Sequence, residues 1–181
     1  MKKVFLFILL LFVTVYFNGC GGSGDSKEEK IYNLSEVEFN TDDGYTYIIS
    51  EGILVTGKVV NYYSNGQLER EEYYKNGKLN GERIEYHENG QIQETETYIN
   101  GMIEGEYKQY YDNGQLSYIV NYENGKEEGA VYGYFEDGSY SLEGNYRNGV
   151  WHGEWIFYNR DGTISSKTYH INGVLQPNYY N

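Results

Sequence analysis

Residues 105–128, GEYKQYYDNGQLSYIVNYENGKEE, contain two Asn-Gly pairs, at 113–114 and 124–125, separated by nine residues in which polar side chains alternate with aromatic or aliphatic ones. An Asn-Gly pair between alternating segments is a strong signal for a β-hairpin, because a type I′ turn needs positive φ at both central residues. The stretch therefore predicts two tight hairpins in succession.

The same pattern recurs five times with a period of 24 residues. One glycine in each unit lies at position 57, 81, 105, 129 or 153. Each unit also holds two turn glycines preceded by Asn or Asp, and these ten are Gly66, Gly77, Gly90, Gly101, Gly114, Gly125, Gly138, Gly149, Gly162 and Gly173. A fixed period of this length is typical of repeat proteins, in which each unit packs on its neighbours. We predict five units over 57–176, in which the unit glycine forms a bulge or kink in the longer strand.

Two-residue loops at all ten turns would fix which side chains face each other. Across the first turns, the residues Tyr63, His87, Tyr111, Phe135 and Asn159 would pair with Leu68, Ile92, Leu116, Tyr140 and Ile164. Across the second turns, Tyr74, Tyr98, Tyr122, Tyr146 and His170 would pair with Leu79, Ile103, Glu127, Trp151 and Leu175. Counting by twos places both sets on one mostly apolar face, with Val59, Arg83, Tyr107, Val131 and Trp155. The row Tyr62, Tyr86, Tyr110, Tyr134 and Tyr158 would lie on the opposite, mostly polar face.

The composition of the chain agrees with a β fold. After residues 1–19, Leu, Ile, Val and Phe make up under a fifth of the residues, a level that together with a net charge of -13 would otherwise predict disorder. The chain has 23 Tyr, however, and each ring can bury a large area while its hydroxyl stays in water. Tyr, Gly and Asn all disfavour helix interiors. We expect an all-β protein, an elongated antiparallel β-meander of hairpins.

The N-terminus, MKKVFLFILLLFVTVYFNGC, has a basic start and an apolar run too short to span a bilayer as a helix. It predicts a signal peptide over 1–19. The stretch 17–20 resembles a bacterial lipobox, although Phe17 stands where Leu is usual and Asn18 where Ala or Ser is usual. The resemblance implies lipid attachment at Cys20 and a protein exported to the cell envelope, at the outer membrane or cell surface. The alternative is ordinary secretory cleavage that leaves Cys20 as an incidental residue.

Three further segments complete the predicted organisation. Residues 20–30 are small and charged and suit a flexible tether, so that the chain would meet the membrane through its lipid anchor only. Residues 31–56 look like a shortened, degenerate repeat that caps one end, with turns near Gly44 and at Glu51-Gly52. Residues 177–181 form a C-terminal tail whose Pro177 would block further strand pairing.

The motifs GxxxxYYxNGQL and YxNGKLNG make residues 57–176 similar to the bacterial variant of the MORN repeat. This resemblance implies tandem β-hairpins and a non-catalytic interaction role. Some members of the family are YwqK-type antitoxins, which pair with a toxin protein. A toxin is therefore one candidate partner.

The residues themselves point to binding and away from catalysis. His87, His152 and His170 occupy three different repeat positions, and the chain has no catalytic triad, Walker loop or dinucleotide fingerprint. We expect no enzyme, no cofactor and no metal site. A chain of this negative charge also disfavours nucleic acid and anionic lipid, whose phosphates are neutralised by Lys and Arg. Acidic residues such as Glu69, Glu71, Glu72, Glu94 and Glu96 are predicted to form a solvated strand face.

The row of five tyrosines beginning at Tyr62 is the one candidate binding face. It has two interpretations, a packing ladder that props the sheet and a display surface for a partner. The preferred hypothesis is a tethered envelope module that binds a protein or a glycan through this face. The alternative is a toxin-neutralising immunity protein, whose acidic sheet masks a basic effector.

Overall fold

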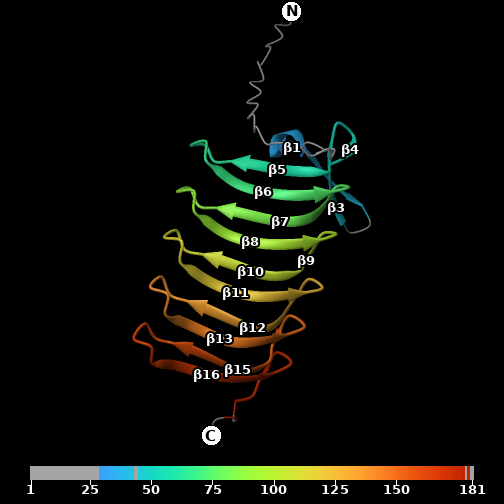
Figure 1. Cartoon of the computed structure of the whole chain (residues 1–181). Coiled ribbons are helices and arrows are strands. Elements are labelled where there is room, and N and C mark those ends of the chain that lie inside the picture. Colours follow the sequence, from blue (N-terminus) through green and yellow to red (C-terminus); the bar gives the residue numbers. More distant parts are fainter. Residues whose placement is uncertain (1–28, 43–44, 178, 180–181) are drawn as a thin grey trace, which may run out of the picture.

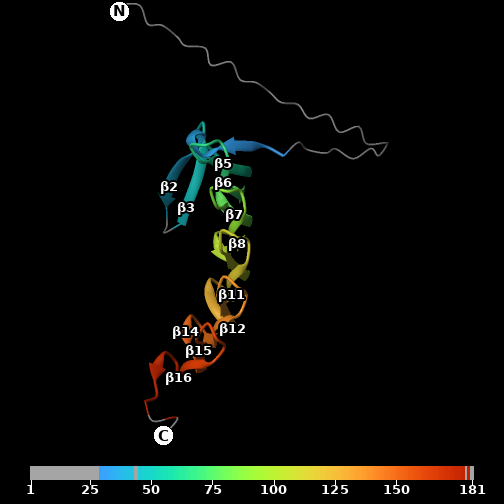
Figure 2. The same cartoon turned by 90° about the vertical axis from the view of Figure 1, so that its left-hand side faces the viewer.

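A computed structural model of the chain describes residues 29–42, 45–177 and 179, and within them the protein is built from β-strands with one 3₁₀ helix and no α-helix. Figure 1 shows the strands stacked one above another from the N-terminal cap to the C-terminus. Figure 2, turned by 90°, shows the same sheet edge-on as a narrow, bent ribbon. The predicted all-β meander of hairpins is confirmed.

The strands follow the repeat. Their bounds are β1 (Ile31–Asn33), β2 (Glu38–Asp42), β3 (Tyr45–Ser50), β4 (Ile53–Leu54), β5 (Gly57–Tyr62), β6 (Leu68–Lys75), β7 (Lys78–Tyr86), β8 (Ile92–Ile99), β9 (Met102–Ile103), β10 (Gly105–Tyr110), β11 (Leu116–Glu123), β12 (Lys126–Tyr134), β13 (Tyr140–Arg147), β14 (Val150–Trp151), β15 (Gly153–Tyr158), β16 (Ile164–Ile171) and β17 (Val174–Leu175), and η1 covers Leu34–Glu36. From β5 onward the strands pair antiparallel in the order β5-β6-β7-β8-β10-β11-β12-β13-β15-β16-β17, and the short β9 and β14 pair only with β8 and β13.

The unit glycines interrupt the longer strands as predicted. Gly81 has φ +135° and Gly105 has φ +83°, values that L side chains rarely adopt. Along β7 the pairing shifts between Glu72↔Arg83 and Tyr74↔Leu79, so the ladder bulges at this glycine. The bulge splits β9 from β10 and β14 from β15 in the later units.

The second turn of every unit is a two-residue turn with positive φ at both positions. Asn76 has φ +50° and Gly77 has φ +77°, as a type I′ turn requires. The five pairs predicted across these turns are all confirmed: Tyr74↔Leu79, Tyr98↔Ile103, Tyr122↔Glu127, Tyr146↔Trp151 and His170↔Leu175.

The first turns have three-residue loops, and the two-residue prediction there is wrong. The Tyr63 backbone N–H donates to the Gln67 carbonyl (2.8 Å), and the Gly66 N–H donates to the Tyr63 carbonyl (2.9 Å). Gly66 has φ +87°, whereas Asn65 does not have positive φ. This is a type I turn followed by a left-handed glycine. The Asn65 side chain favours it, because its Oδ1 accepts a hydrogen bond from the Gln67 N–H (2.9 Å).

The longer loop changes the face on which one apolar row lies. Tyr62 pairs with Leu68 and Asn61 pairs with Arg70, so Glu69 is an extra residue that bulges the strand. In every unit the residue that pairs with Leu68 or its counterpart lies one position before the predicted one. The observed residues are Tyr62, Tyr86, Tyr110, Tyr134 and Tyr158, in place of the predicted Tyr63, His87, Tyr111, Phe135 and Asn159. Residues opposite each other in a ladder share a face. Leu68 and its counterparts therefore lie with the tyrosine row, not opposite it as predicted.

We call the face that carries the buried Val59, Val131 and Trp155 the inner face, and the other the outer face. A C-terminal cluster on the inner face joins Val120, Val131 and Trp155 with flanking tyrosines. Trp155 stacks on Trp151 with ring centroids 4.0 Å apart. The Trp155 ring fits because Gly144 opposite it has no side chain, and a Cβ there would lie 2.4 Å from the ring. Large and small side chains are thus matched across the strands.

The N-terminal end of the inner face is covered by the cap. Tyr32, Val37 and Val55 pack against Val59 and Tyr74. The cap does not extend the ladder as a further antiparallel hairpin, because β1 pairs parallel with β5 and β2-β3-β4 form a separate three-stranded sheet (Figure 2). Its β3–β4 turn lies at Glu51 and Gly52, both with positive φ. The turn predicted near Gly44 lies outside the described residues.

Between the two apolar clusters the inner face holds a charged network around Arg83. Its guanidinium binds Glu72 (3.1 Å), Glu96 (2.8 Å) and Glu94 (3.3 Å), and it also contacts Glu85. The prediction that these glutamates form a solvated face is wrong for Glu72 and Glu96, which are buried. Burial raises the pKa of Glu96 despite the nearby arginine. A buried carboxylate needs such a partner because charge is costly to desolvate.

The predicted signal peptide at 1–19 and the predicted lipid attachment site Cys20 lie outside the described residues. Within the part of the chain that the structure describes, no helix has the length and hydrophobicity needed to cross a bilayer.

The two turn geometries predict opposite responses to the same substitution. Asn100 has φ +53° in a second turn, so Asn100→Gly should leave the free energy of unfolding within about 0.5 kcal/mol of wild type. Asn89, in a first turn, accepts from the Gln91 N–H (2.9 Å) and donates to the Asp112 carbonyl (2.6 Å). Asn89→Gly removes both hydrogen bonds and should therefore lower the free energy of unfolding by about 1–2 kcal/mol. Urea unfolding of both variants tests this, and equal losses would contradict the assignment of different turns.

Candidate binding surface

The outer face carries a continuous row of paired side chains next to the first turns. We call it the tyrosine strip, and it consists of the row Tyr62, Tyr86, Tyr110, Tyr134 and Tyr158 with the ladder partners Leu68, Ile92, Leu116, Tyr140 and Ile164. Each unit contributes one pair, because each first turn has the same three-residue loop. The strip therefore runs along the sheet from β5 to β16.

Much of the strip is open to solvent. Tyr62 is 52% exposed, Tyr140 is 48% exposed and Ile164 is 51% exposed. In the C-terminal half, the Tyr140 ring lies 5.1 Å from that of Tyr134 and 6.4 Å from that of Tyr158. Tyr132, two residues before Tyr134, adds a further ring 6.1 Å from Tyr140. Contiguous exposed apolar side chains of this kind mark interaction surfaces.

Hydroxyl groups of the strip are held by carboxylates on the same face. Tyr86 Oη donates to Glu71 Oε1 (2.7 Å), and Tyr158 Oη donates to Glu143. Glu71 also binds Lys58 Nζ at 2.7 Å. Burial raises the pKa of Glu71, but the hydrogen bonds from Lys58 and Tyr86 outweigh burial and hold this pKa below its ordinary value. Burial and the hydrogen bond to Glu71 raise the pKa of Tyr86 to about 12. Members of the row thus hydrogen-bond to side chains of their own face, while part of the row stays exposed to solvent.

The residues once expected to face Leu68 and its counterparts connect successive turns instead. Tyr63 Oη donates to the Tyr86 carbonyl (2.6 Å), and Tyr111 Oη donates to the Tyr134 carbonyl (2.8 Å). His87 Nε2 lies 3.0 Å from the Tyr110 carbonyl oxygen. Each of these bonds reaches the backbone of the next unit. The strip is therefore fixed at its edge by a chain of hydrogen bonds, which limits its motion.

Sequence reasoning found the five tyrosines of the row but missed their partners. A two-residue loop at the first turns would place these partners on the buried face; they are Leu68, Ile92, Leu116, Tyr140 and Ile164. The sequence offers no clear signal for this difference, because both kinds of turn contain Asn-Gly and the Asn65 Oδ1 accepts from a backbone N–H, which every residue except proline has. Tyr132 was missed because no other unit has an aromatic residue at its position.

The Tyr86–Glu71 bond predicts an elevated titration midpoint for one tyrosine. Tyrosine in an unfolded chain titrates near pH 10, so stability from neutral Tyr86 is present below about pH 10 and is lost as pH rises toward 12. A ¹³Cζ-tyrosine NMR titration, with the signal assigned by Tyr86→Phe, should give a midpoint near 12. Glu71→Gln removes the carboxylate charge and should lower that midpoint. A wild-type midpoint near 10 would contradict the bond.

The model of the MORN repeat variant matches residues 55–78, 79–100, 103–124 and 151–175, which together make up just over half of the chain. No curated protein matches the chain in sequence. A chain in the crystal structure of accessory secretory protein 1, 2 and 3 in Streptococcus pneumoniae is similar over 71% of this chain and 21% of that chain, at 15% identity and a TM-score of 0.33. This chain thus spans about a fifth of the length of that one.

Proposed function

This chain belongs to the MORN repeat variant family, and we propose that it is a non-catalytic interaction protein that binds a protein partner through the tyrosine strip. The single observation that carries the proposal is the outer-face pairing of tyrosine with Leu, Ile or Tyr in all five units, with one exposed member of the pair in four of them. A repeated apolar row that stays in solvent has no use in the core, whose clusters lie on the other face.

The chemistry of the strip supports a protein partner over a small substrate. Tyrosine offers a large apolar ring with few rotatable bonds and a hydroxyl that can hydrogen-bond, and it is enriched where proteins bind each other. The hydrogen bonds between successive first turns hold the strip in place before a partner arrives. Such preorganisation lowers the entropic cost of association. A glycan remains the second class of ligand that an aromatic sheet face suits.

The proposed site of action is the cell envelope. Support comes from the sequence of residues 1–20, with its basic start, apolar run and terminal Gly-Cys. Lipid attached at Cys20, followed by the small and charged residues up to Lys30, would hold the repeat sheet away from the membrane.

The anchor has a direct test. Cells expressing the full chain should hold it in the membrane fraction, labelled by radioactive palmitate, because acyl chains partition into the bilayer. The Cys20→Ala chain should lose the label and move to the soluble fraction. The Gly21→Ala chain should keep the label and stay in the membrane fraction. Unchanged labelling of the Cys20→Ala chain would overturn lipid attachment at this residue.

The second candidate function is neutralisation of a basic toxin. The observation that favours it is the net charge of -13, which attracts a cationic protein over distances of about 10 Å at 0.1 M salt. An exported chain could meet only a toxin that arrives from outside the cell.

Affinity capture from envelope extracts tests the proposed interaction. The full chain is compared with a strip variant, Tyr62→Ser, Ile92→Ser and Tyr140→Ser, at positions that are exposed. Loss of these contacts should weaken capture of any specific partner at least about tenfold, since each anchor contributes on the order of 1 kcal/mol. Mass spectrometry identifies the partner, and a small basic protein would select the second candidate.

A matched control separates surface loss from unfolding. Ile53→Ser, Ile171→Ser and Val174→Ser alter three exposed apolar residues outside the strip and should leave capture unchanged. Both variants should keep the wild-type circular dichroism spectrum. A folded strip variant that captures as well as wild type, or a wild-type chain that captures nothing beyond the control resin, would overturn the proposal.

A further inference from the structure

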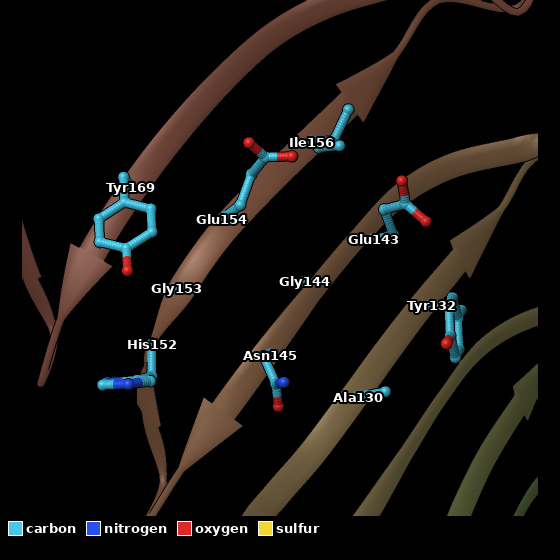
Figure 3. Close-up of a pocket in the computed structure, with 10 residues that line it drawn as sticks. All are labelled: Ala130, Tyr132, Glu143, Gly144, Asn145, His152, Gly153, Glu154, Ile156 and Tyr169. Carbon is cyan, nitrogen blue, oxygen red and sulfur yellow. The ribbon is translucent and has the colours of Figure 1, made fainter. Parts of the chain in front are cut away.

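The outer face has a hollow of about 420 Å³ across β12, β13, β15 and β16. Ala130 and Tyr132 lie on β12 at one side, Tyr169 lies on β16 at the other, Asn145 lies between them, and Glu143 and Glu154 supply two carboxylates (Figure 3). No Lys or Arg is among the residues that line it. The hollow is thus acidic, aromatic and open to solvent.

One of the residues that line the hollow, Ala130, is small where the other units have a long side chain. The position of Ala130 is held in the other four units by the long charged residues Lys58, Glu82, Glu106 and Glu154. A methyl group at this position leaves open the space that a long side chain takes up elsewhere. Most of the unit that carries Ala130 is also unmatched by the family model, whose matches stop at residue 124 and resume at residue 151.

The first unit shows what occupies the corresponding place there. Lys58 takes the position of Ala130, and its ammonium nitrogen lies 2.7 Å from Glu71 and 4.8 Å from the centre of the Tyr73 ring. Glu71 corresponds to Glu143 three repeats later. The first unit therefore fills this place with a cation of its own, held by a carboxylate and an aromatic face.

The fourth unit keeps the carboxylate but has no such cation. Glu143 accepts a hydrogen bond from Tyr158, as Glu71 does from Tyr86. Within the described residues, however, Glu143 forms no ion pair with Lys or Arg. The fifth unit has the same pair with the charges exchanged, Glu154 and Lys167 at 3.2 Å. Glu143 therefore occupies the position of Glu71, but the residue at the position of its partner Lys58 is Ala130.

We propose that the hollow binds the ammonium or guanidinium group of a Lys or Arg side chain from a partner protein. Glu143 would bind the cation as Glu71 binds Lys58, while Tyr132 and Tyr169 would contact the aliphatic stem. This inference rests on the proposed interaction function and names one feature of the partner, a basic side chain placed to reach β12 and β13 while the partner covers the tyrosine strip. The hollow and the strip are neighbours, because the ring of Tyr132, which lines the hollow, contacts the ring of Tyr140, which belongs to the strip.

Short peptides test the hollow on the full chain. N-acetylated, C-amidated Gly-Arg-Gly and Gly-Lys-Gly are titrated into ¹⁵N-labelled protein and compared with Gly-citrulline-Gly, a neutral isostere of the arginine peptide. The amide signals of Ala130 and Asn145 should shift and saturate with the two cationic peptides, and the arginine peptide should bind at least tenfold more tightly than the citrulline peptide. Equal affinity for arginine and citrulline would overturn the proposal. Saturable shifts with cellobiose but not with arginine would assign the hollow to a neutral glycan and overturn it as well.

Substitutions that fill or open the hollow make the test specific. Ala130→Lys should place an internal ammonium on Glu143, as in the first unit, and abolish peptide binding without lowering the unfolding midpoint. Glu143→Gln should weaken arginine-peptide binding at least tenfold. Thr97→Lys adds the same charge to an exposed outer-face position on β8 and should leave affinity within twofold of wild type. Lys58→Ala should open a second cation-binding site in the first unit, detected as shifts of the amide signals near Glu71 when the arginine peptide is added.

The two proposals can fail separately. If Ala130→Lys captures the partner as well as wild type while the strip variant does not, the hollow is unused and the interaction function stands. If the arginine peptide binds wild type but no partner is captured, the hollow binds cations and the interaction function is overturned. Peptide binding to Ala130→Lys as tight as to wild type would overturn the assignment of Glu143 as the ligand.

Discussion

The structure depends on the alternation of two turn geometries along one ladder. Second turns use two residues with positive φ, Asn76-Gly77 and its counterparts, and they keep the even-odd register of the flanking strands. First turns use three residues with a left-handed glycine only, and the extra residue bulges the strand that follows. Because side chains alternate with a period of two, one extra residue per unit moves a row from one face to the other. The tyrosine strip is the direct result.

The core is consistent with the unusual composition of the chain. It is not a continuous aliphatic layer but two clusters of Val, Tyr and Trp, with the Arg83 network between them. Glycine takes part in packing where Trp155 lies against Gly144, which no larger residue could replace without displacing the ring. In a repeat protein each unit contacts mainly its neighbours, so the core can change character from unit to unit without loss of the fold. That freedom permits a charged segment in the middle of the sheet.

The same freedom lets the outer face of a single unit differ from that of the others. The positions of Lys58 and Glu71 form an internal ion pair in the first unit. In the fifth unit the same two positions form an ion pair with the charges exchanged, Glu154 with Lys167. In the fourth unit one of the two residues is Ala130, and the outer face gains a hollow beside the most aromatic part of the strip. The repeats thus provide their own reference for what each position does. A departure from that reference marks a candidate site more clearly than any single motif in this chain.

Much of this could be predicted from the residues alone. The 24-residue period, the β class, the second-turn pairs such as Tyr74↔Leu79 and the bulge at Gly81 all follow from local rules, because Asn-Gly and isolated glycines act over a few residues. The tyrosine row was likewise evident as a repeated position. The face of Leu68, the burial of Glu72 and Glu96 and the hollow at Ala130 could not be predicted in this way. The first depends on whether Asn65 adopts positive φ or hydrogen-bonds to Gln67, and the others depend on which strands lie side by side, so only the three-dimensional packing decides them.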